Sequence, residues 1–373
     1  ITGVNADVEK ILFSNFDQRA ADSTIYDASL ASGLTTVGLT SSSANGDTVF
    51  TGLQNIVDAE MASGEANLTV TYVNSAVSGD SDTSTLTLSE QTGGTFTETS
   101  ASAGGLEILN VVSEGSANEV GITSTRNTLT TVNISGDQDL TTTVTSSVIE
   151  TINASTFTGD LDLTVVGDTD ISVTGGSGDD ALTLPDFDED DTVDGGDGTD
   201  TLSIANGITA AADLEGVSNV EVLEVTGNHK TVTLDADASV MNFDFSTAHS
   251  QDLTLADGVT GAVTVTVGAG VDEIVNTADT TLTIKGTATA IDAQTTITGG
   301  ADATDTIEIT ADTDSATEAS IVIPAGLTNI DKILVVDAGD NTEVGEDDSS
   351  GKDIELTTGS YATALTIDAS ALD

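Results

Sequence analysis

The sequence predicts an all-β fold, a parallel β-solenoid or β-roll whose coils stack on one another. Three observations support this prediction. Apolar side chains alternate with threonine and other polar residues, strand-sized segments recur about 20 residues apart, and a glycine- and aspartate-rich nonapeptide occurs twice. Tandem β-sandwich domains, whose strands recur about every 8–12 residues, are the alternative.

From Leu68 onward the alternation has a period of two, which is typical of a sheet with one buried face. It predicts strands at 68–72, 85–88 and 106–111. Residues 17–31 carry the best helical spacing in the less repetitive N-terminal part, so we expect a helix there. Aromatic residues make up 3% of the chain, which favours thin, closely stacked coils over a bulky core.

Two patterns repeat along the chain. Residues 129–136 resemble residues 149–156, which places Asn133 and Asn153 at equivalent positions 20 residues apart. Each copy is followed by a predicted strand, at 140–144 and 161–165. A second pattern links 214–225 with 327–336. Repeats of this length are the expected size of one solenoid coil.

The nonapeptide G-G-x-G-x-D-x-U-x, where U is a large aliphatic residue, fits 175–183 and 195–203. Its glycines allow backbone angles closed to other residues and let carbonyl groups approach a cation. Its aspartates supply the hard oxygens that Ca²⁺ prefers. The residues concerned are Gly175, Gly176, Gly178 and Asp180 in the first copy, and Gly195, Gly196, Asp197, Gly198 and Asp200 in the second.

One full coil takes two such units, so the two copies should stack on the same side and Ca²⁺ should lie between them. Residues 190–193 then form the opposite rung, with Asp191 as a further candidate ligand. Looser copies at 268–274 and 299–307 add the candidates Asp272, Asp302 and Asp305. Gly-Gly and Asp-Gly are also ordinary turn dipeptides, so a pair of metal-free turns is the alternative interpretation.

At these residues the chain resembles RTX-type calcium-binding proteins of Gram-negative bacteria, particularly their S-layer and large surface proteins. The resemblance implies secretion by a type I system and calcium-dependent folding outside the cell. From the patterns along the chain we expect a division into a mixed segment at 1–66, strand repeats at 67–170, an RTX β-roll at 171–210 and solenoid repeats at 211–373.

The charge balance excludes several classes of partner. Acidic residues number 63 against 7 basic ones, which gives a formal net charge of −56. Nucleic acid and anionic membranes are therefore not expected as partners, because the chain offers phosphates no positive surface. Hydrophobic residues reach 37%, too many for a disordered polyanion. Repulsion on this scale opposes folding unless cations or salt neutralise it.

Cysteine is absent, which removes disulfides and thiol chemistry. No apolar run approaches the length of about 18 residues that a membrane-spanning helix needs. The chain begins with Ile1 and its last residues stop inside a repeat, so we expect a fragment that continues from an upstream region and is truncated at its C-terminal end.

The expected function is structural: a secreted protein of the cell surface that forms a calcium-stabilised surface layer or related assembly. Its expected partners are copies of itself, in a lattice or a filament, and a cell-surface polysaccharide. A segment of a large RTX adhesin that binds a surface or a glycan is the alternative. A calcium-dependent polysaccharide lyase is a minor alternative, since no basic residue lies beside the motif in sequence and no catalytic motif is present. We therefore expect no enzyme activity.

Overall fold

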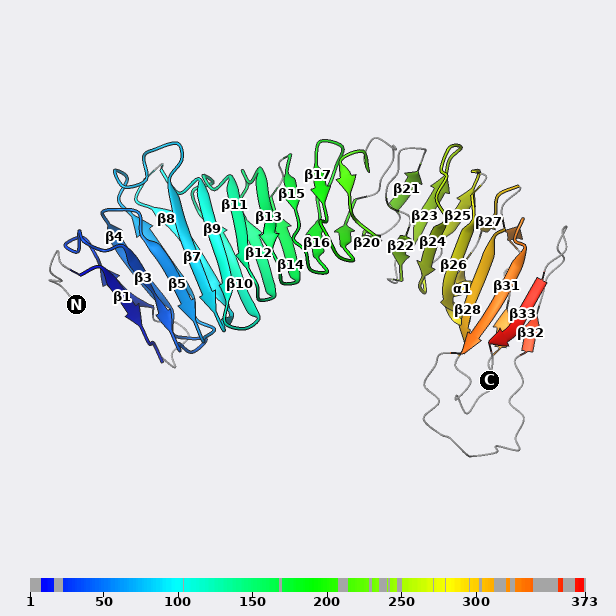
Figure 1. Cartoon of the computed structure of the whole chain (residues 1–373), viewed down its shortest axis with the longest axis horizontal. Coiled ribbons are helices and arrows are strands. Elements are labelled where there is room, and N and C mark those ends of the chain that lie inside the picture. Colours follow the sequence, from blue (N-terminus) through cyan, green and yellow to red (C-terminus); the bar gives the residue numbers. More distant parts are fainter. Residues whose placement is uncertain are drawn as a thin grey trace, which may run out of the picture. The chain divides into compact units, whose positions relative to one another are not determined.

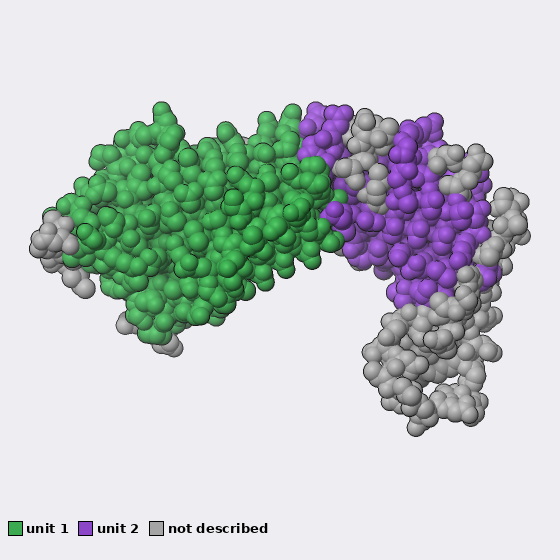
Figure 2. Space-filling model, viewed as in Figure 1, with its two compact units in different colours: residues 1–186, 190–202, 218–220 green, residues 187–189, 203–217, 221–373 purple. Residues whose placement is uncertain are grey.

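The structure is a computed structural model and describes most of the chain. The described residues are 8–16, 23–102, 104–167, 170–206, 214–227, 230–234, 240, 242–246, 250–270, 272–278, 280–294, 296–301, 304–311, 320–322, 326–337, 355–357 and 366–371. The chain divides into two compact units (Figure 2). Unit 1 comprises residues 1–186, 190–202 and 218–220, and unit 2 comprises residues 187–189, 203–217 and 221–373.

In unit 1 the chain alternates between two parallel sheets, so that each coil contributes one strand to each (Figure 1). The first sheet has the order β1 (Lys10–Phe13), β3 (Thr36–Thr40), β5 (Asp58–Ala62), β7 (Thr83–Ser89), β9 (Ile108–Glu114), β11 (Thr131–Gly136), β13 (Thr151–Phe157), β15 (Ser172–Thr174) and β17 (Thr192–Asp194). The second has the order β2 (Thr24–Asp27), β4 (Thr48–Leu53), β6 (Leu68–Tyr72), β8 (Thr92–Ser100), β10 (Asn118–Ser124), β12 (Leu140–Thr145), β14 (Leu161–Val166) and β16 (Ala181–Leu184). The chain then runs through β18 (Thr201–Ile204) and β19 (Val217–Ser218).

Unit 2 repeats the plan. One sheet has the order β20 (Val222–Val225), β22 (Asn242–Phe245), β24 (Val263–Val267), β26 (Leu282–Thr287), β28 (Thr306–Ala311), β31 (Lys332–Asp337) and β33 (Thr366–Ala371). The other has the order β21 (Lys230–Leu234), β23 (Gln251–Leu255), β25 (Glu273–Asn276), β27 (Thr296–Thr298) and β30 (Leu327–Thr328). A short pair joins β29 (Ser320–Val322) to β32 (Glu355–Thr357), and the short helix α1 (Ala288–Ala293) follows β26.

The pairing confirms the predicted parallel β-solenoid. Asn133 of β11 lies opposite Asn153 of β13, and Leu140 of β12 lies opposite Leu161 of β14, both in parallel register. The repeats of about 20 residues are therefore single coils stacked in register. Tandem β-sandwiches are excluded, because their sheets are built from antiparallel strands.

The core is a thin layer of aliphatic side chains between the two sheets. Strands alternate buried and exposed positions, as β12 does with Leu140 and Val144 inward and Thr141 and Thr143 outward. Larger rings gather in the first coils, where Phe13, Tyr26 and Phe50 lie with centroids 5.5–5.8 Å apart. This alternation is the physical basis of the period-two pattern in the sequence.

The strand predictions hold where the alternation is strongest. The segment 68–72 is β6, 85–88 lies within β7, and 106–111 overlaps β9. The helix expected at 17–31 is wrong for 24–27, which form β2 paired in parallel with β4. Residues 17–22 lie outside the described residues. Within the part of the chain that the structure describes, no helix has the length and apolarity to cross a membrane.

Candidate metal centre

The two nonapeptides form turns on consecutive coils, as the sequence predicts. Residues 175–180 connect β15 to β16, and residues 195–200 connect β17 to β18. The Asp197 amide donates to the Gly176 carbonyl over 3.1 Å, so the second turn rests on the first. Of residues 190–193, predicted as the opposite rung, Thr192 and Val193 lie in β17. The two motif copies, which start 20 residues apart in the sequence, are therefore neighbours in space.

The glycines are required by this stacking. Gly196 and Gly198 have φ of +107° and +129°, a region that residues with a Cβ rarely adopt. A Cβ on Gly196 would collide with the carbonyl oxygen of Gly176, and one on Gly198 with that of Gly178. A Cβ on Gly175 would meet the carbonyl oxygen of Gly195 in the same way. Close backbone approach therefore accounts for the glycine positions of the motif.

The aspartates of the motif join neighbouring coils. Asp180 is buried, and its Oδ1 accepts the Leu161 amide over 2.9 Å while its Oδ2 accepts the Gly176 amide over 2.6 Å. Asp200, also buried, accepts the Asp180 amide at its own Oδ1 over 2.8 Å. The Asp180 carboxylate therefore satisfies the amide that opens β14 on the preceding coil, and the Asp200 carboxylate satisfies the amide directly before β16.

The other candidate aspartates make the same contact. Asp272 accepts the Gln251 amide over 2.7 Å, and Asp305 accepts the amides of Leu282 and Gly300 over 2.7 and 2.6 Å. Asp191, at the opposite corner of its coil, accepts the Ile171 amide over 2.8 Å. The looser motif copies thus keep the aspartate contact although they have lost glycines. Asp302 lies outside the described residues.

A second, exposed column of aspartates runs beside the buried one. The Asp160 amide donates to Asp139 over 3.0 Å, the Asp179 amide to Asp160 over 2.9 Å, and the Thr199 amide to Asp179 over 2.8 Å. These carboxylates bond toward the following coil, whereas Asp180 and Asp200 bond toward the preceding one. The motif did not reveal this column, but an aspartate directly before the leucine that opens β12 and β14 was the available signal.

Burial raises the pKa of the inner carboxyl groups. Loss of hydration raises the pKa of Asp180 and Asp305 although backbone hydrogen bonds act in the opposite direction. For Asp272 the same loss of hydration raises the pKa to about 6. The charged form is therefore disfavoured at these positions, and a nearby cation would offset that effect.

The oxygen atoms available at the stacked turns suit Ca²⁺ chemically, because carboxylate and carbonyl oxygens are the ligands that Ca²⁺ prefers. A carboxylate oxygen that accepts one amide hydrogen has a further lone pair to offer. Among the described residues, no group of three or more Asp, Glu, His or Cys side chains is placed to hold a metal ion. A calcium ion at this stack would therefore depend on peptide carbonyl oxygens of the glycine turns in addition to the carboxylates.

One buried acid was not predicted. Glu98 of β8 points inward and accepts from the Leu106 amide and the Ser124 hydroxyl over 3.3 and 3.1 Å. Burial raises the pKa of its carboxyl group. Period-two alternation places position 98 on the inner face, so the acid at an inward position was the signal for it.

Comparison with known proteins found no relative of this chain. No family model matches the chain, and neither a curated protein nor a solved structure matches it. The resemblance to RTX-type proteins therefore rests on the residues of the two stacked turns at 175–183 and 195–203.

Proposed function

We propose that this chain is a structural building block of an extracellular surface layer or related assembly, and that Ca²⁺ stabilises its coils. The protein is secreted, by a type I system, and folds at the cell surface, where it assembles with copies of itself. We assign it no catalytic residues.

The stacking of like charges carries this proposal. Coil register brings the Asp160 carboxylate to the Asp179 amide, and the buried Asp200 carboxylate to the amide of the buried Asp180. The whole chain bears a formal net charge of −56, so these stacked carboxylates add local repulsion to a general one. Divalent cations relieve both, and a chain that needs them folds only where they are abundant.

The affinity of such sites suits an extracellular switch. Extracellular calcium modules bind with dissociation constants of about 10⁻⁴–10⁻³ M, too weak to fill inside a cell. With calcium at about 100 times the dissociation constant, each site adds about 2.7 kcal/mol to the free energy of unfolding. A few sites would then supply much of the stability of a domain.

We propose that copies of the chain meet in a lattice or filament, which a cell-surface polysaccharide anchors.

Electron microscopy of the purified chain tests the proposal. We expect ordered sheets or filaments with calcium and dispersed particles after chelation. In light scattering, the chelated monomer should have a larger hydrodynamic radius than the calcium-bound monomer. Unchanged particles in both conditions, with no ordered assembly in either, would reject it.

A further inference from the structure

An open groove lies on the outer face of unit 2, beside α1. It has a volume of about 610 Å³, within the range of about 300–1,000 Å³ usual for small-molecule sites. The groove exists because β26 leads directly into α1, which folds back against the sheet. Gly286 permits this packing, since a Cβ there would lie 2.9 Å from Cγ2 of Val267 and 3.3 Å from Cβ of Ala290.

The charged residues of the groove form one pair. Lys285 of β26 lies opposite Glu308 of β28 in parallel register, and the Lys285 Nζ is 3.4 Å from the Glu308 Oε1. Both side chains reach solvent, with 44% and 24% of their surfaces exposed. The pair offers a ligand hydrogen-bond donors and acceptors side by side without a net charge.

The remaining polar groups of the groove are neutral hydroxyls. They belong to Ser246, Thr266, Thr287, Thr289 and Thr310, while Val267 and Ala290 supply apolar surface. Thr287 caps α1 by accepting the Ala290 amide over 3.2 Å, so its position is fixed. The site thus combines a mostly apolar surface with several hydroxyl groups that both donate and accept hydrogen bonds.

This chemistry selects a neutral ligand rich in hydroxyl groups. The carboxylate of Glu308 and the charge of the whole chain disfavour an anion, and the ammonium group of Lys285 disfavours a cation. A neutral sugar residue presents adjacent hydroxyls that can accept from lysine and donate to glutamate at once. We propose that this groove binds a neutral saccharide unit of a polysaccharide. The proposal rests on the polysaccharide contact of the proposed function, for which it supplies a site, and depends on neither calcium nor assembly.

The test uses backbone amide spectra of the isotopically labelled full chain in calcium-free buffer with about 0.5 M NaCl, which screens the repulsion among the acids without supplying calcium. Glucose, galactose, rhamnose and N-acetylglucosamine are titrated separately, with glucuronate as the anionic probe. At least one neutral sugar should shift the amide signals of Gly268 and Gly286, and Lys285→Met should weaken that binding about tenfold, as expected for loss of a hydrogen bond to a charged donor.

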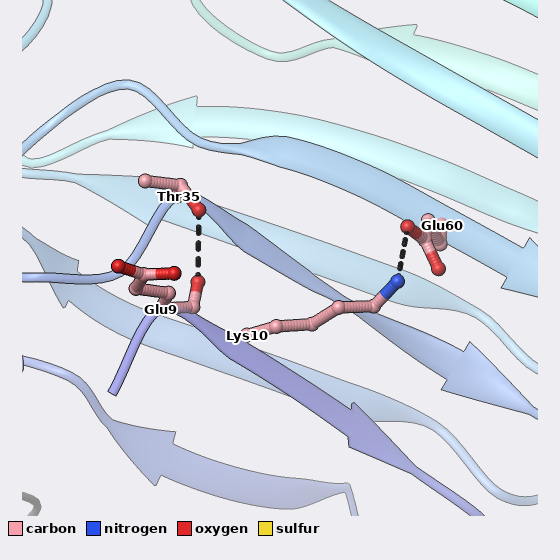
Figure 3. Close-up of polar contacts among 4 residues, drawn as sticks. All are labelled: Glu9, Lys10, Thr35 and Glu60. Carbon is pink, nitrogen blue, oxygen red and sulfur yellow. Dashed lines mark hydrogen bonds and ion pairs between the residues drawn. The ribbon is translucent and has the colours of Figure 1, made fainter. Parts of the chain in front are cut away.

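A matched control exists in unit 1. There Lys10 of β1 reaches across β3 to Glu60 of β5, with Nζ and Oε1 2.6 Å apart (Figure 3). The neighbouring Thr35 hydroxyl donates to the Glu9 carbonyl over 3.0 Å. Lys10→Met also breaks an exposed ion pair between strands, but it leaves the groove intact and should not change sugar binding.

Thr289→Trp gives an independent variant, because it fills the groove from an exposed position of α1 and leaves both residues of the ion pair in place. It should abolish the shifts. The proposal fails if no neutral sugar shifts the two glycine signals, if glucuronate binds more tightly than every neutral sugar, or if Lys285→Met and Thr289→Trp bind as the Lys10→Met control does.

Discussion

The carboxyl group of Asp180 and its own amide connect three successive coils. Its oxygens accept from Leu161 on the preceding coil and from Gly176 in its own turn, and its amide donates to Asp200 on the next coil. The nonapeptide pattern identified Asp180 and Asp200 but not the backbone amides that their carboxylates accept. The reason is that one spacing of glycine and aspartate suits both a cation and a stacked backbone, so the spacing alone does not separate the two roles.

Replacing Asp180 with alanine should destabilise unit 1 by about 2–4 kcal/mol, because two buried amides lose their acceptor. Asp180→Asn should lose about half as much, since its carbonyl oxygen can still accept from Leu161. Urea unfolding measures the difference, and hydrogen exchange at Leu161 and Gly176 locates it. Equal stability of wild type and Asp180→Ala would contradict the assigned role.

Gly196→Ala should cost about 2–4 kcal/mol, because its φ of +107° and its contact with the Gly176 carbonyl both exclude a Cβ. Gly121→Ala is the control. Gly121 lies within β10, and its added Cβ would come no closer than 3.2 Å to the flexible Thr95 hydroxyl. Thermal unfolding should separate the two variants clearly, and similar losses for both would show that stacking does not explain Gly196.

At the scale of single elements, alternation in the sequence was sufficient for strands with one buried face, and β6 matches its prediction at both ends. It failed at 24–27, where the β-branched and aromatic residues of β2 pair with β4 in spite of a loose helical spacing. It also gave no sign of α1, whose six residues are too few to establish a helical period. Because the groove beside α1 depends on this helix, it could not be predicted from the sequence.

Coils in unit 2 are joined by hydrogen bonds of Gln251, which opens β23, and of Asp272, which directly precedes β25. Asp272 accepts the Gln251 amide, and its own amide donates to the Gln294 side chain over 2.8 Å. The pKa of Asp272 is raised to about 6 by burial, above its ordinary value. The folded state therefore binds a proton before the unfolded state does as the pH falls.

The contribution of Asp272 should consequently stabilise unit 2 as the pH is lowered from about 7 to about 5, and this gain should be lost again as the pH rises through about 6. Asp272→Asn, which is neutral at every pH, should show a smaller gain over the same range. Asp257→Asn removes an equal charge from an exposed position and serves as the control. Parallel pH profiles for wild type and Asp272→Asn would refute the prediction.

For the whole molecule, charge is the dominant constraint. Acids outnumber bases by 63 to 7, yet the core contains aliphatic layers that hold the sheets together in each unit. Composition predicts a dependence on cations, and the repeat length predicted the coils that the structure confirms. Neither could give the ligands of an ion, because those depend on how carbonyl groups turn within each corner.

Stability should rise with ionic strength. Raising NaCl from about 0.02 M to about 0.5 M shortens the Debye length from about 20 Å to about 4 Å and screens most exposed repulsion. The melting temperature should increase across this range. A constant melting temperature would show that repulsion among exposed acids does not limit stability.

Calcium should stabilise beyond this screening. At about 10 mM, ten or more times the expected dissociation constant, each site should add about 1.4 kcal/mol relative to NaCl of equal ionic strength. The double variant Asp180→Ala with Asp200→Ala should lose part of that excess and take up less calcium by calorimetry. Equal unfolding curves in the two salts would rule out specific calcium sites.

The pairing of Asn133 with Asn153 and of Leu140 with Leu161 has an evolutionary consequence. A single-residue indel inside a strand would turn its aliphatic side chains out to solvent. Gain or loss of one complete repeat preserves every pairing on either side of it. Among natural variants of this protein, length changes that include strands should therefore be whole multiples of that repeat. Insertions of other lengths should occur only in the turns between strands.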